Sequence, residues 1–181
     1  MRSVTRYKAV VIPVIRNRYV VVEDAKYREL TFVVGGCKIR EIGTTPDKTA
    51  ANTSRDRRRE FARFRTCAVR ELDEETRGVF GKVDPEVLVP AFNFESRNRS
   101  KAEEKKDLRE GVVVTMKYYV FYLYLDMPST KFGEIRQKFK RSRRRGREEN
   151  ETKDIFLMSR RELEKAKIWR FMRDYVLRKL K

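Results

Sequence analysis

Three glutamates lie close together in the sequence RELDEE, at positions 71, 74 and 75. On a helix these positions are i, i+3 and i+4, so their side chains project from one face within a single turn. Because like charges repel, the cluster is either a well-solvated surface or a site for Mg²⁺ or Mn²⁺, which prefer oxygen ligands. In the second case, Glu71, Glu74 and Glu75 are the candidate metal ligands. In this arrangement Arg70 orients a carboxylate and Gly36 offers a carbonyl oxygen.

A helix and a preceding strand must hold these groups. Apolar residues recur at helical spacing from about residue 58 to residue 76, which predicts one continuous helix with Gly78 as its C-cap. The apolar side of that helix is formed by Phe61, Phe64, Ala68 and Leu72. Upstream, the polar residues 43–57 predict a loop. The strand before this loop ends at Gly35-Gly36, where the backbone can turn tightly or approach a ligand closely.

The remaining elements follow from the same kind of pattern. Segments rich in Val, Ile and aromatic residues predict strands at 9–14, 19–23, 31–34, 87–92, 112–125 and 155–158. Ser159 and Glu162 form a capping-box pattern that opens a C-terminal helix. Its predicted buried stripe comprises Leu163, Ala166, Trp169, Met172, Val176 and Leu180. The order of strands, helix, strands and helix predicts an α+β or mixed-sheet layered fold in one domain spanning 1–181.

Composition narrows the chemistry and the partners. The 181 residues include 45 Lys and Arg, and the formal net charge is +18, which favours polyanionic partners such as nucleic acid or phosphorylated substrates. The absence of His makes a zinc finger and His-dependent triads unlikely. The only cysteines are Cys37 and Cys67, so a disulfide framework is not expected, and Cys37 is interpreted as a small buried residue without chemistry.

The sequence also bears on location. It begins with no recognisable leader and contains no apolar run of the roughly 18 residues that a membrane span needs. We therefore expect a soluble intracellular protein with no membrane partner. Residence is expected to be cytoplasmic, and the basic run at 138–147 is also typical of nuclear localisation.

The glutamate segment resembles the signature of the Nudix hydrolases. Residues 70–75 match its REUxEE core, Ala68, Thr76 and Gly78 resemble its flanks, and residues 33–36 resemble the strand and glycine pair that open it. The resemblance covers most of the chain. It implies an α/β/α sandwich with a mixed sheet, and Mg²⁺- or Mn²⁺-dependent hydrolysis of a nucleoside diphosphate linked to another moiety.

The sequence departs from the family pattern in three places. The segment between Gly36 and Arg70 carries an insertion of about 20 residues. Ala62 stands where counting back from the arginine places the signature's first glutamate, and Glu60 or Glu41 are alternatives for its role. Arg77 displaces the glycine that follows the signature's last glutamate.

The resemblance also implies catalytic roles. Glu71 and Glu75 are the leading metal ligands, and Glu74 shares the site. The general base varies across the family, so Glu71 and a downstream glutamate are both candidates. Glu151 lies where many relatives place an additional acidic residue, and the alternatives to it are Glu148 and Glu149.

The basic segments suggest the substrate. Those at 97–109 and 138–147 fit a groove that follows an RNA backbone, and a purine cap would stack on aromatics such as Tyr118, Phe92 or Trp169. The predicted substrate-binding cations are Lys138, Lys140, Arg143, Arg144 and Arg145. The first substrate expected is the 5′ cap of mRNA, with release of methylated GDP. The insertion and the basic surface also resemble Nudix enzymes of large DNA viruses.

Two alternatives stay open. One is a pyrophosphatase acting on diphosphoinositol polyphosphates, ADP-ribose or other nucleotide derivatives. The other belongs to a different class, a nucleic-acid-binding module on a Nudix scaffold that hydrolyses nothing.

Overall fold

A mixed seven-stranded sheet forms the centre of the molecule. The structure is a computed structural model that describes residues 2–43, 54–96, 109, 111–142 and 151–180. The strands are β1 (Arg2–Ile15), β2 (Arg18–Asp24), β3 (Leu30–Thr31), β4 (Val33–Gly36), β5 (Val89–Ser96), β6 (Val112–Tyr124) and β7 (Thr152–Met158). Their order is β3-β2-β1-β6-β5, with β4 also paired to β1 and β7 to β2.

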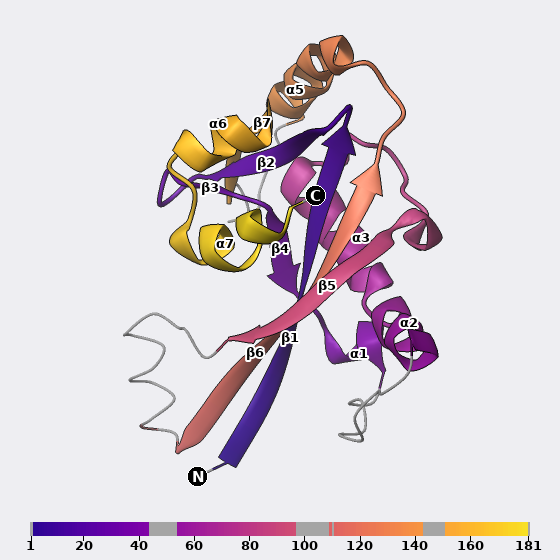
Figure 1. Cartoon of the computed structure of the whole chain (residues 1–181), viewed down its shortest axis with the longest axis vertical. Coiled ribbons are helices and arrows are strands. Elements are labelled where there is room, and N and C mark those ends of the chain that lie inside the picture. Colours follow the sequence, from indigo (N-terminus) through magenta and orange to yellow (C-terminus); the bar gives the residue numbers. More distant parts are fainter. Residues whose placement is uncertain (1, 44–53, 97–108, 110, 143–150, 181) are drawn as a thin grey trace.

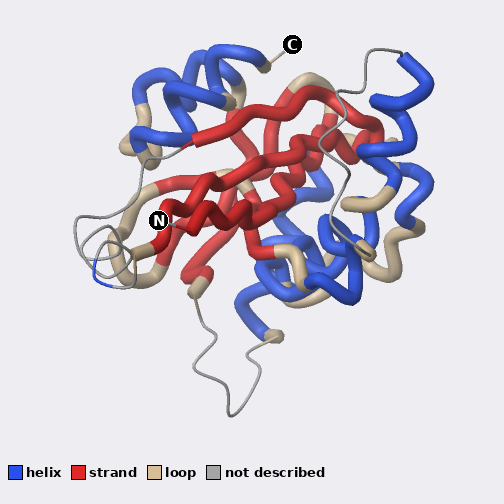
Figure 2. The backbone as a smooth tube through the Cα atoms, turned by 90° about the horizontal axis from the view of Figure 1, so that it is seen from below, coloured by secondary structure: helices blue, strands red, loops and turns tan. Residues whose placement is uncertain are grey.

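Helices cover both faces of this sheet (Figures 1 and 2). They are α1 (Ile39–Ile42), α2 (Ser54–Ala62), α3 (Arg65–Thr76), α5 (Phe132–Arg141), α6 (Arg160–Lys165) and α7 (Arg170–Tyr175). Short 3₁₀ turns occupy Pro85–Val87, Ser129–Lys131 and Leu177–Lys179. The predicted α+β fold with a mixed sheet between helical layers is therefore confirmed.

The two long strands β1 and β6 run parallel and supply both cores. Their register extends from Arg2↔Val112 to Val14↔Tyr124. Successive side chains point to opposite faces of a sheet. Accordingly, Ala9, Val11, Tyr119 and Phe121 join one core, and Val10, Ile12, Tyr118 and Val120 join the other. The other strand pairs are antiparallel.

The first core lies under the helix that carries the glutamates. Phe61, Phe64, Ala68 and Leu72 are all buried, as their spacing predicts. Phe64 stacks on Tyr119 with ring centroids 3.7 Å apart, and Phe61 meets the same ring edge-on at 5.3 Å. These contacts fix the helix against the central strands.

The helix prediction is wrong in its extent. The expected single helix is two helices, α2 and α3, and α2 begins at Ser54, inside the segment predicted as a loop. The break occurs at Arg63 and Phe64, whose N–H groups donate to the carbonyls of residues three positions earlier, as in a 3₁₀ turn. This tighter turn leaves Phe61 and Phe64 both buried while the helix axis changes direction.

The predicted C-terminal helix is also interrupted. The capping box forms, because the Ser159 side chain accepts from Glu162 N and the Glu162 side chain accepts from Ser159 N. After α6, however, the chain pairs with the sheet: Leu30 N donates to Lys167 O at 2.9 Å and Trp169 N donates to Leu30 O at 2.7 Å. These bonds satisfy the backbone that a continuous helix would have paired internally. The helical pattern is therefore overridden by pairing with β3.

Several strands exceed their predicted bounds. β1 begins at Arg2, although its first residues are charged and do not alternate, because β6 pairs with it over that whole length. The segment predicted as one strand at 31–34 is divided at Phe32 into β3 and β4. No helix within the described part of the chain is both long and apolar enough to cross a membrane.

The sheet parts along one edge of β1. β4 pairs with β1 over Lys8–Val11, whereas β2 pairs with the same edge only at Val14 and Ile15. From there β2 diverges to pair with β3 and β7. The two partners of β1 therefore separate, and a cavity opens between them.

Candidate active site

Helix α3 presents the three predicted glutamates beside the glycine pair of β4. Glu71 is 7% exposed, Glu74 is exposed and Glu75 is half-buried. Leu72, on the opposite side, is 1% exposed and holds the helix to the first core. Burial of the apolar side thus directs the carboxylates toward β4, β7 and solvent.

Arg70 links the strand and the helix. Its guanidinium donates to Glu41 Oε1 at 2.5 Å and to Gly36 O at 2.7 Å. It also pairs with Glu71 and with Glu74, each at 2.7 Å. The hydrogen bond that Arg70 donates to Glu41 is the first cause of the raised pKa of Arg70, so the side chain stays charged. Arg70 therefore orients two of the three glutamates and holds the carbonyl that the sequence predicts as a metal ligand.

The two alternatives for the signature's first glutamate lie in different surroundings. Of the two alternatives for the signature's first glutamate, Glu41 lies against Arg70, and its carboxylate also accepts from Lys38 N. Glu60 lies elsewhere and accepts from Lys117 and Tyr119. Burial alone would raise the pKa of Glu41, but the hydrogen bonds from Arg70 and Lys38 hold it below its usual value.

Glu71 requires a glycine at position 35. A Cβ added to Gly35 would lie 1.6 Å from Glu71 Oε2 and 1.8 Å from its Cδ. The carboxylate therefore sits directly over the Gly35 Cα. Burial raises the pKa of Glu71, and Arg70 opposes that effect.

Glu75 faces three other carboxylates. The Thr152 hydroxyl at the start of β7 donates to it. Burial is the main reason that its pKa is raised to about 7, and the negative charges of Glu151, Glu71 and Asp24 raise it further. A group that is buried among like charges is typical of a functional site.

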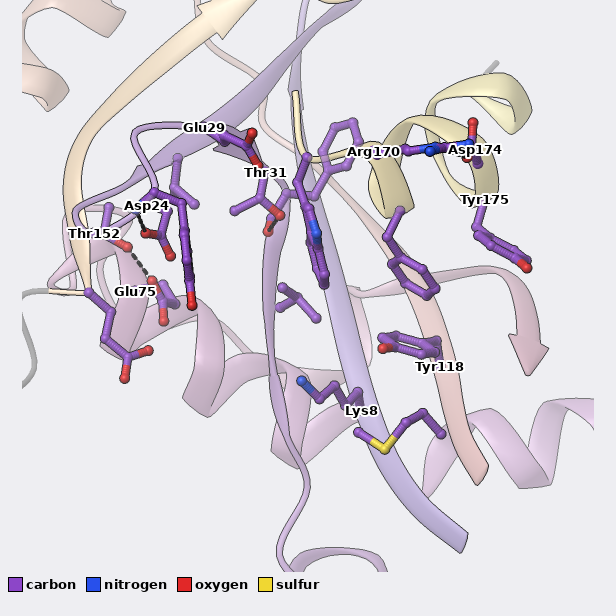
Figure 3. Close-up of a pocket in the computed structure, with 18 residues that line it drawn as sticks. Lys8, Asp24, Glu29, Thr31, Glu75, Tyr118, Thr152, Arg170, Asp174 and Tyr175 are labelled. Carbon is purple, nitrogen blue, oxygen red and sulfur yellow. Dashed lines mark hydrogen bonds and ion pairs between the residues drawn. The ribbon is translucent and has the colours of Figure 1, made fainter. Parts of the chain in front are cut away.

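A cavity of about 900 Å³ opens beside Glu75. In Figure 3, Asp24, Glu75 and Thr152 lie toward one end, Tyr118, Tyr175, Arg170 and Asp174 toward the other, and Lys8 below the space between them. The lining comes from β1, β2, β3, β4, β6, β7, α3, α7 and their adjoining turns, at the place where β2 and β4 separate. The position of the cavity follows from the parting of the sheet.

Residues outside the glutamate helix contribute carboxylates to this cavity. The predicted downstream glutamate, Glu151, lines it together with Glu75. Its alternatives, Glu148 and Glu149, lie outside the described residues. The sequence reading missed Asp24 and Thr152. The signal for Asp24 was a carboxylate at the end of a predicted strand, and Thr152 had no comparable signal.

The oxygen atoms around Glu75 are of the kind that bind divalent cations. Within the described ranges, no three acidic or cysteine side chains form a group arranged to hold a metal ion, and Glu71 and Glu74 are instead paired with Arg70. The available donors are nevertheless all oxygens, as Mg²⁺ and Mn²⁺ prefer. A positive charge near Glu75 would also relieve the repulsion that raises its pKa.

The prediction for the cysteines is wrong. Cys37 and Cys67 form a disulfide, with their Cα atoms 5.3 Å apart. Cys37 directly follows the glycine pair and its N–H donates to Tyr7 O, while Cys67 is buried in the first turn of α3. The two residues meet because β4 ends beside α3, which places them within the usual Cα distance for a disulfide. A covalent bond therefore joins the glycine strand to the glutamate helix.

The predicted substrate-binding cations are only partly described. Lys138 and Lys140 are exposed on α5, outside the cavity lining, and Lys140 lies 3.5 Å from Asp154. Arg143, Arg144 and Arg145 fall outside the described residues, as does most of the segment at 97–109.

Two of the three aromatics predicted for base stacking line the cavity. Tyr118 and Trp169 belong to the lining, whereas Phe92 does not and instead lies under Lys179. Trp169 was also predicted to be buried, but it is 37% exposed. It emerges where the C-terminal segment leaves β3 and enters α7.

Arg77 stands where the family pattern has glycine, and it adopts a left-handed conformation with φ of 56°. Its guanidinium donates to Phe139 O at 3.1 Å and to Thr152 O at 2.8 Å. It also lies over the Phe139 ring at 4.0 Å. The residue thus ties the end of α3 to α5 and β7, which explains why a side chain is accommodated there.

No protein-family model matches the sequence, and no curated protein matches it either. Solved structures do match. A Nudix hydrolase from Nitrosomonas europaea is 11% identical with a TM-score of 0.50, covering 97% of this chain and 91% of its own. The Nudix domain of Shewanella oneidensis NrtR, complexed with ADP ribose, is 8% identical with a TM-score of 0.49, covering 99% and 86%. A C. elegans Ap4A hydrolase is 13% identical with a TM-score of 0.48, covering 97% and 93%.

At these identities the match concerns the fold. The Nitrosomonas europaea structure matches over nearly the whole of both chains. The parted mixed sheet, the helical layers on both of its faces and the glycine strand beside the glutamate helix agree with the resemblance that the sequence predicts. The chain has the fold of the Nudix hydrolases.

Proposed function

We propose that this chain is a Nudix-type pyrophosphatase that cleaves a diphosphate bond in a nucleoside diphosphate-linked substrate, using Mg²⁺ or Mn²⁺. One observation carries the proposal: on α3, Glu71 lies against Gly35 of β4, and Glu75, one turn further along, lines a cavity of about 900 Å³. A cavity of this size suits a nucleotide-sized ligand. Its lining combines carboxylates, which can hold the cation that a diphosphate needs, with aromatic rings on which a base can stack.

The metal ligands proposed are Glu71, Glu74, Glu75 and the Gly36 carbonyl. A bound divalent ion would neutralise phosphate charge and lower the pKa of a coordinated water. Arg70 contributes by holding Glu71, Glu74 and the Gly36 carbonyl in fixed positions relative to one another. Its role is positioning, since it contacts the ligands rather than the space of the cavity.

Glu151 is the proposed general base. It is exposed and lines the cavity beside Glu75, so its carboxylate can accept a proton from a water molecule there. Glu71, the other candidate, is 7% exposed and packs against Gly35, where water has less access. Lys8 lines the same cavity and supplies a positive charge for phosphate oxygens.

The 5′ cap of RNA is the first substrate proposed. The net charge of +18 exceeds what a small nucleotide requires, and a long polyanion engages many cations. On α5 the exposed Lys138, Lys140 and Arg141 lie near β7, the strand that carries Thr152 into the cavity. An RNA body following this helix would leave its capped end near the glutamates.

The test is incubation with RNA labelled in the cap phosphates, with and without Mg²⁺ or Mn²⁺. The unmodified protein should release a labelled nucleoside diphosphate, and Glu71→Gln and Glu75→Gln should each lower the rate by at least about 100-fold. Glu164→Gln, an exposed change on α6, serves as the control and should leave the rate unchanged. Intact RNA in every reaction would refute decapping.

ADP-ribose and diphosphoinositol polyphosphates are the second group of substrates to assay. They have no long polyanionic tail, so their turnover should depend weakly on salt, whereas RNA turnover should fall steeply. If none of these compounds is cleaved but RNA is bound, the chain is a binding module. The retention of three mutually repelling glutamates supports the enzyme over that alternative.

A further inference from the structure

The cavity carries more negative charge than its metal site needs. Among the residues that the structure describes, five carboxylates line it and two cationic side chains, Lys8 and Arg170, oppose them. The carboxylates are Asp24, Glu29, Glu75, Glu151 and Asp174. This acidic lining contrasts with a net charge of +18 for the chain. Glu75 is a proposed metal ligand, and Asp24 and Glu151 act on it electrostatically, which leaves Glu29 and Asp174 without an assigned role.

Trp169 offers a stacking surface beside Glu29. It is 37% exposed and lines the cavity. The Trp169 ring contacts the Phe171 ring, with centroids 5.2 Å apart, and Phe171 in turn packs on Tyr118 at 4.9 Å. A ring that is backed by a packed cluster and open to a cavity can receive a planar ligand without losing much side-chain entropy.

Backbone hydrogen bonds fix Trp169 relative to Glu29. Trp169 N donates to Leu30 O at 2.7 Å, and Leu30 N donates to Lys167 O at 2.9 Å. Glu29 is adjacent to Leu30, lines the cavity, and lies near Thr31 in Figure 3. Its side chain pairs with Lys167 at 3.5 Å, and Lys167 is 71% exposed, so this contact exchanges readily with water or a ligand. Asp174, by contrast, is shared between Arg170 and Arg178.

We infer that Trp169 and Glu29 form a base-binding subsite selective for guanine, and above all for a guanine ring that carries a positive charge, as N7-methylguanine does. Trp169 would stack on the ring, and tryptophan is the side chain that binds cations best through its face. An ionised carboxylate only accepts hydrogen bonds. Guanine presents two adjacent donors on its Watson–Crick edge, whereas adenine presents a donor and an acceptor, so Glu29 would favour guanine.

This subsite deepens the proposed function and rests on it for the identity of the substrate, but its test does not require catalysis. Trp169 is the only tryptophan in the chain, so its fluorescence reports stacking directly. We would titrate the protein with N7-methyl-GDP, GDP and ADP, with a chelator present to prevent hydrolysis. The expected result is strong quenching, with N7-methyl-GDP bound at least about tenfold more tightly than ADP.

Single variants test the contributions of Glu29 and Trp169 to binding separately. Glu29→Gln should weaken N7-methyl-GDP binding by about tenfold and change ADP binding by less than about twofold, since only guanine uses both carboxylate oxygens. Trp169→Leu should weaken all three nucleotides by about tenfold or more, measured by equilibrium dialysis, and Trp169→Phe should restore most of the loss. Glu164→Gln is the matched control, and thermal melting confirms that each variant is folded.

Two outcomes would overturn the inference: the absence of quenching by every nucleotide, or an equal effect of Glu29→Gln on N7-methyl-GDP and ADP. Failure of the proposed function gives a different result from failure of the subsite. If the binding preference holds but no diphosphate is cleaved with Mg²⁺ or Mn²⁺, the subsite stands and the pyrophosphatase assignment fails. If cleavage occurs with no preference between guanine and adenine substrates, the subsite alone is refuted.

Discussion

Glu71 Oε2 lies where a Cβ on Gly35 would be, 1.6 Å from that position. A side chain at residue 35 and the carboxylate in its present place are mutually exclusive. At Gly36, its neighbour, an added Cβ would have no atom of the described part of the chain within 4 Å, apart from its own chain neighbours. The two adjacent glycines therefore have different reasons to be glycine, and they provide a matched pair of substitutions.

Gly35→Ala should displace the Glu71 carboxylate and destabilise the protein by about 1–3 kcal/mol, as overpacking of a tight site does. Its diphosphate hydrolysis should fall by at least about tenfold, because a proposed metal ligand has moved. Gly36→Ala should retain stability and most activity. Urea unfolding and a hydrolysis assay on both variants check this. Equal losses in the two variants would contradict the prediction.

Metal binding should raise the melting temperature. A ligand that binds only the folded state stabilises it by mass action, by about 2.7 kcal/mol at 100 times its dissociation constant. Mg²⁺ or Mn²⁺ should therefore stabilise the unmodified protein, and Glu71→Gln and Glu75→Gln should abolish the effect. The measurement is thermal melting of each protein over a range of Mg²⁺ or Mn²⁺ concentrations, with Glu164→Gln as the control. A metal-dependent shift that persists in Glu75→Gln would exclude that residue as a ligand.

The disulfide between Cys37 and Cys67 should contribute substantially to stability. It closes a loop across a sequence separation of 30, for which chain entropy gives about 3–4 kcal/mol. The double variant Cys37→Ser with Cys67→Ser should lose about this amount in denaturant unfolding. Reductant should lower the stability of the unmodified protein by a similar amount and leave the double variant unchanged. If reductant affects both proteins alike, the disulfide is not the cause.

Glu60 should make stability depend on acid pH. Burial alone would raise its pKa, but hydrogen bonds from Tyr119 and Lys117 hold the pKa below the ordinary value of 4.5. A carboxyl group whose pKa is lower in the folded state stabilises the protein above 4.5, and this contribution is lost as the pH falls below it. Glu60→Gln should therefore cost about 1–3 kcal/mol at pH 7.

The difference between the two proteins should shrink as the pH falls below 4.5, because the unfolded chain then takes up a proton at Glu60 that the folded protein binds less readily. Chemical unfolding of both proteins from pH 7 to pH 3 provides the comparison. Glu134→Gln, an exposed change on α5, controls for general charge effects. A constant difference across the pH range would show that hydrogen-bond geometry, rather than ionisation, is responsible.

Patterns within a few residues of the sequence predicted the helices that bury one side against the sheet. The spacing of Phe61 and Leu72 predicted the buried side of the helical segment, and the Ser159 capping box marked the start of α6. Both signals arise within a few residues of the chain. The glutamate cluster, its helix and the glycine strand could therefore be read from sequence.

Long-range contacts account for what was not predicted. Glu41 meets Arg70 across 29 positions, and Cys37 meets Cys67 across an insertion whose path no local pattern specifies. The end of α6 depends on pairing with Leu30, which lies more than 130 positions earlier. In each case the partner is chosen by the packing of distant elements, so residue type alone was insufficient.

The separation of β2 from β4 affects how substitutions on the two sides of the cavity combine. The cavity is lined from both faces of the sheet. Glu75 comes from α3, which packs on the first core, and Trp169 lies just before α7, which packs on the second. Substitutions in the two layers touch different parts of a ligand and share few neighbours, so their effects should be nearly additive. Under the proposed function, substitutions around Trp169 would change which nucleoside is bound, and substitutions around the glutamates would change the rate of cleavage.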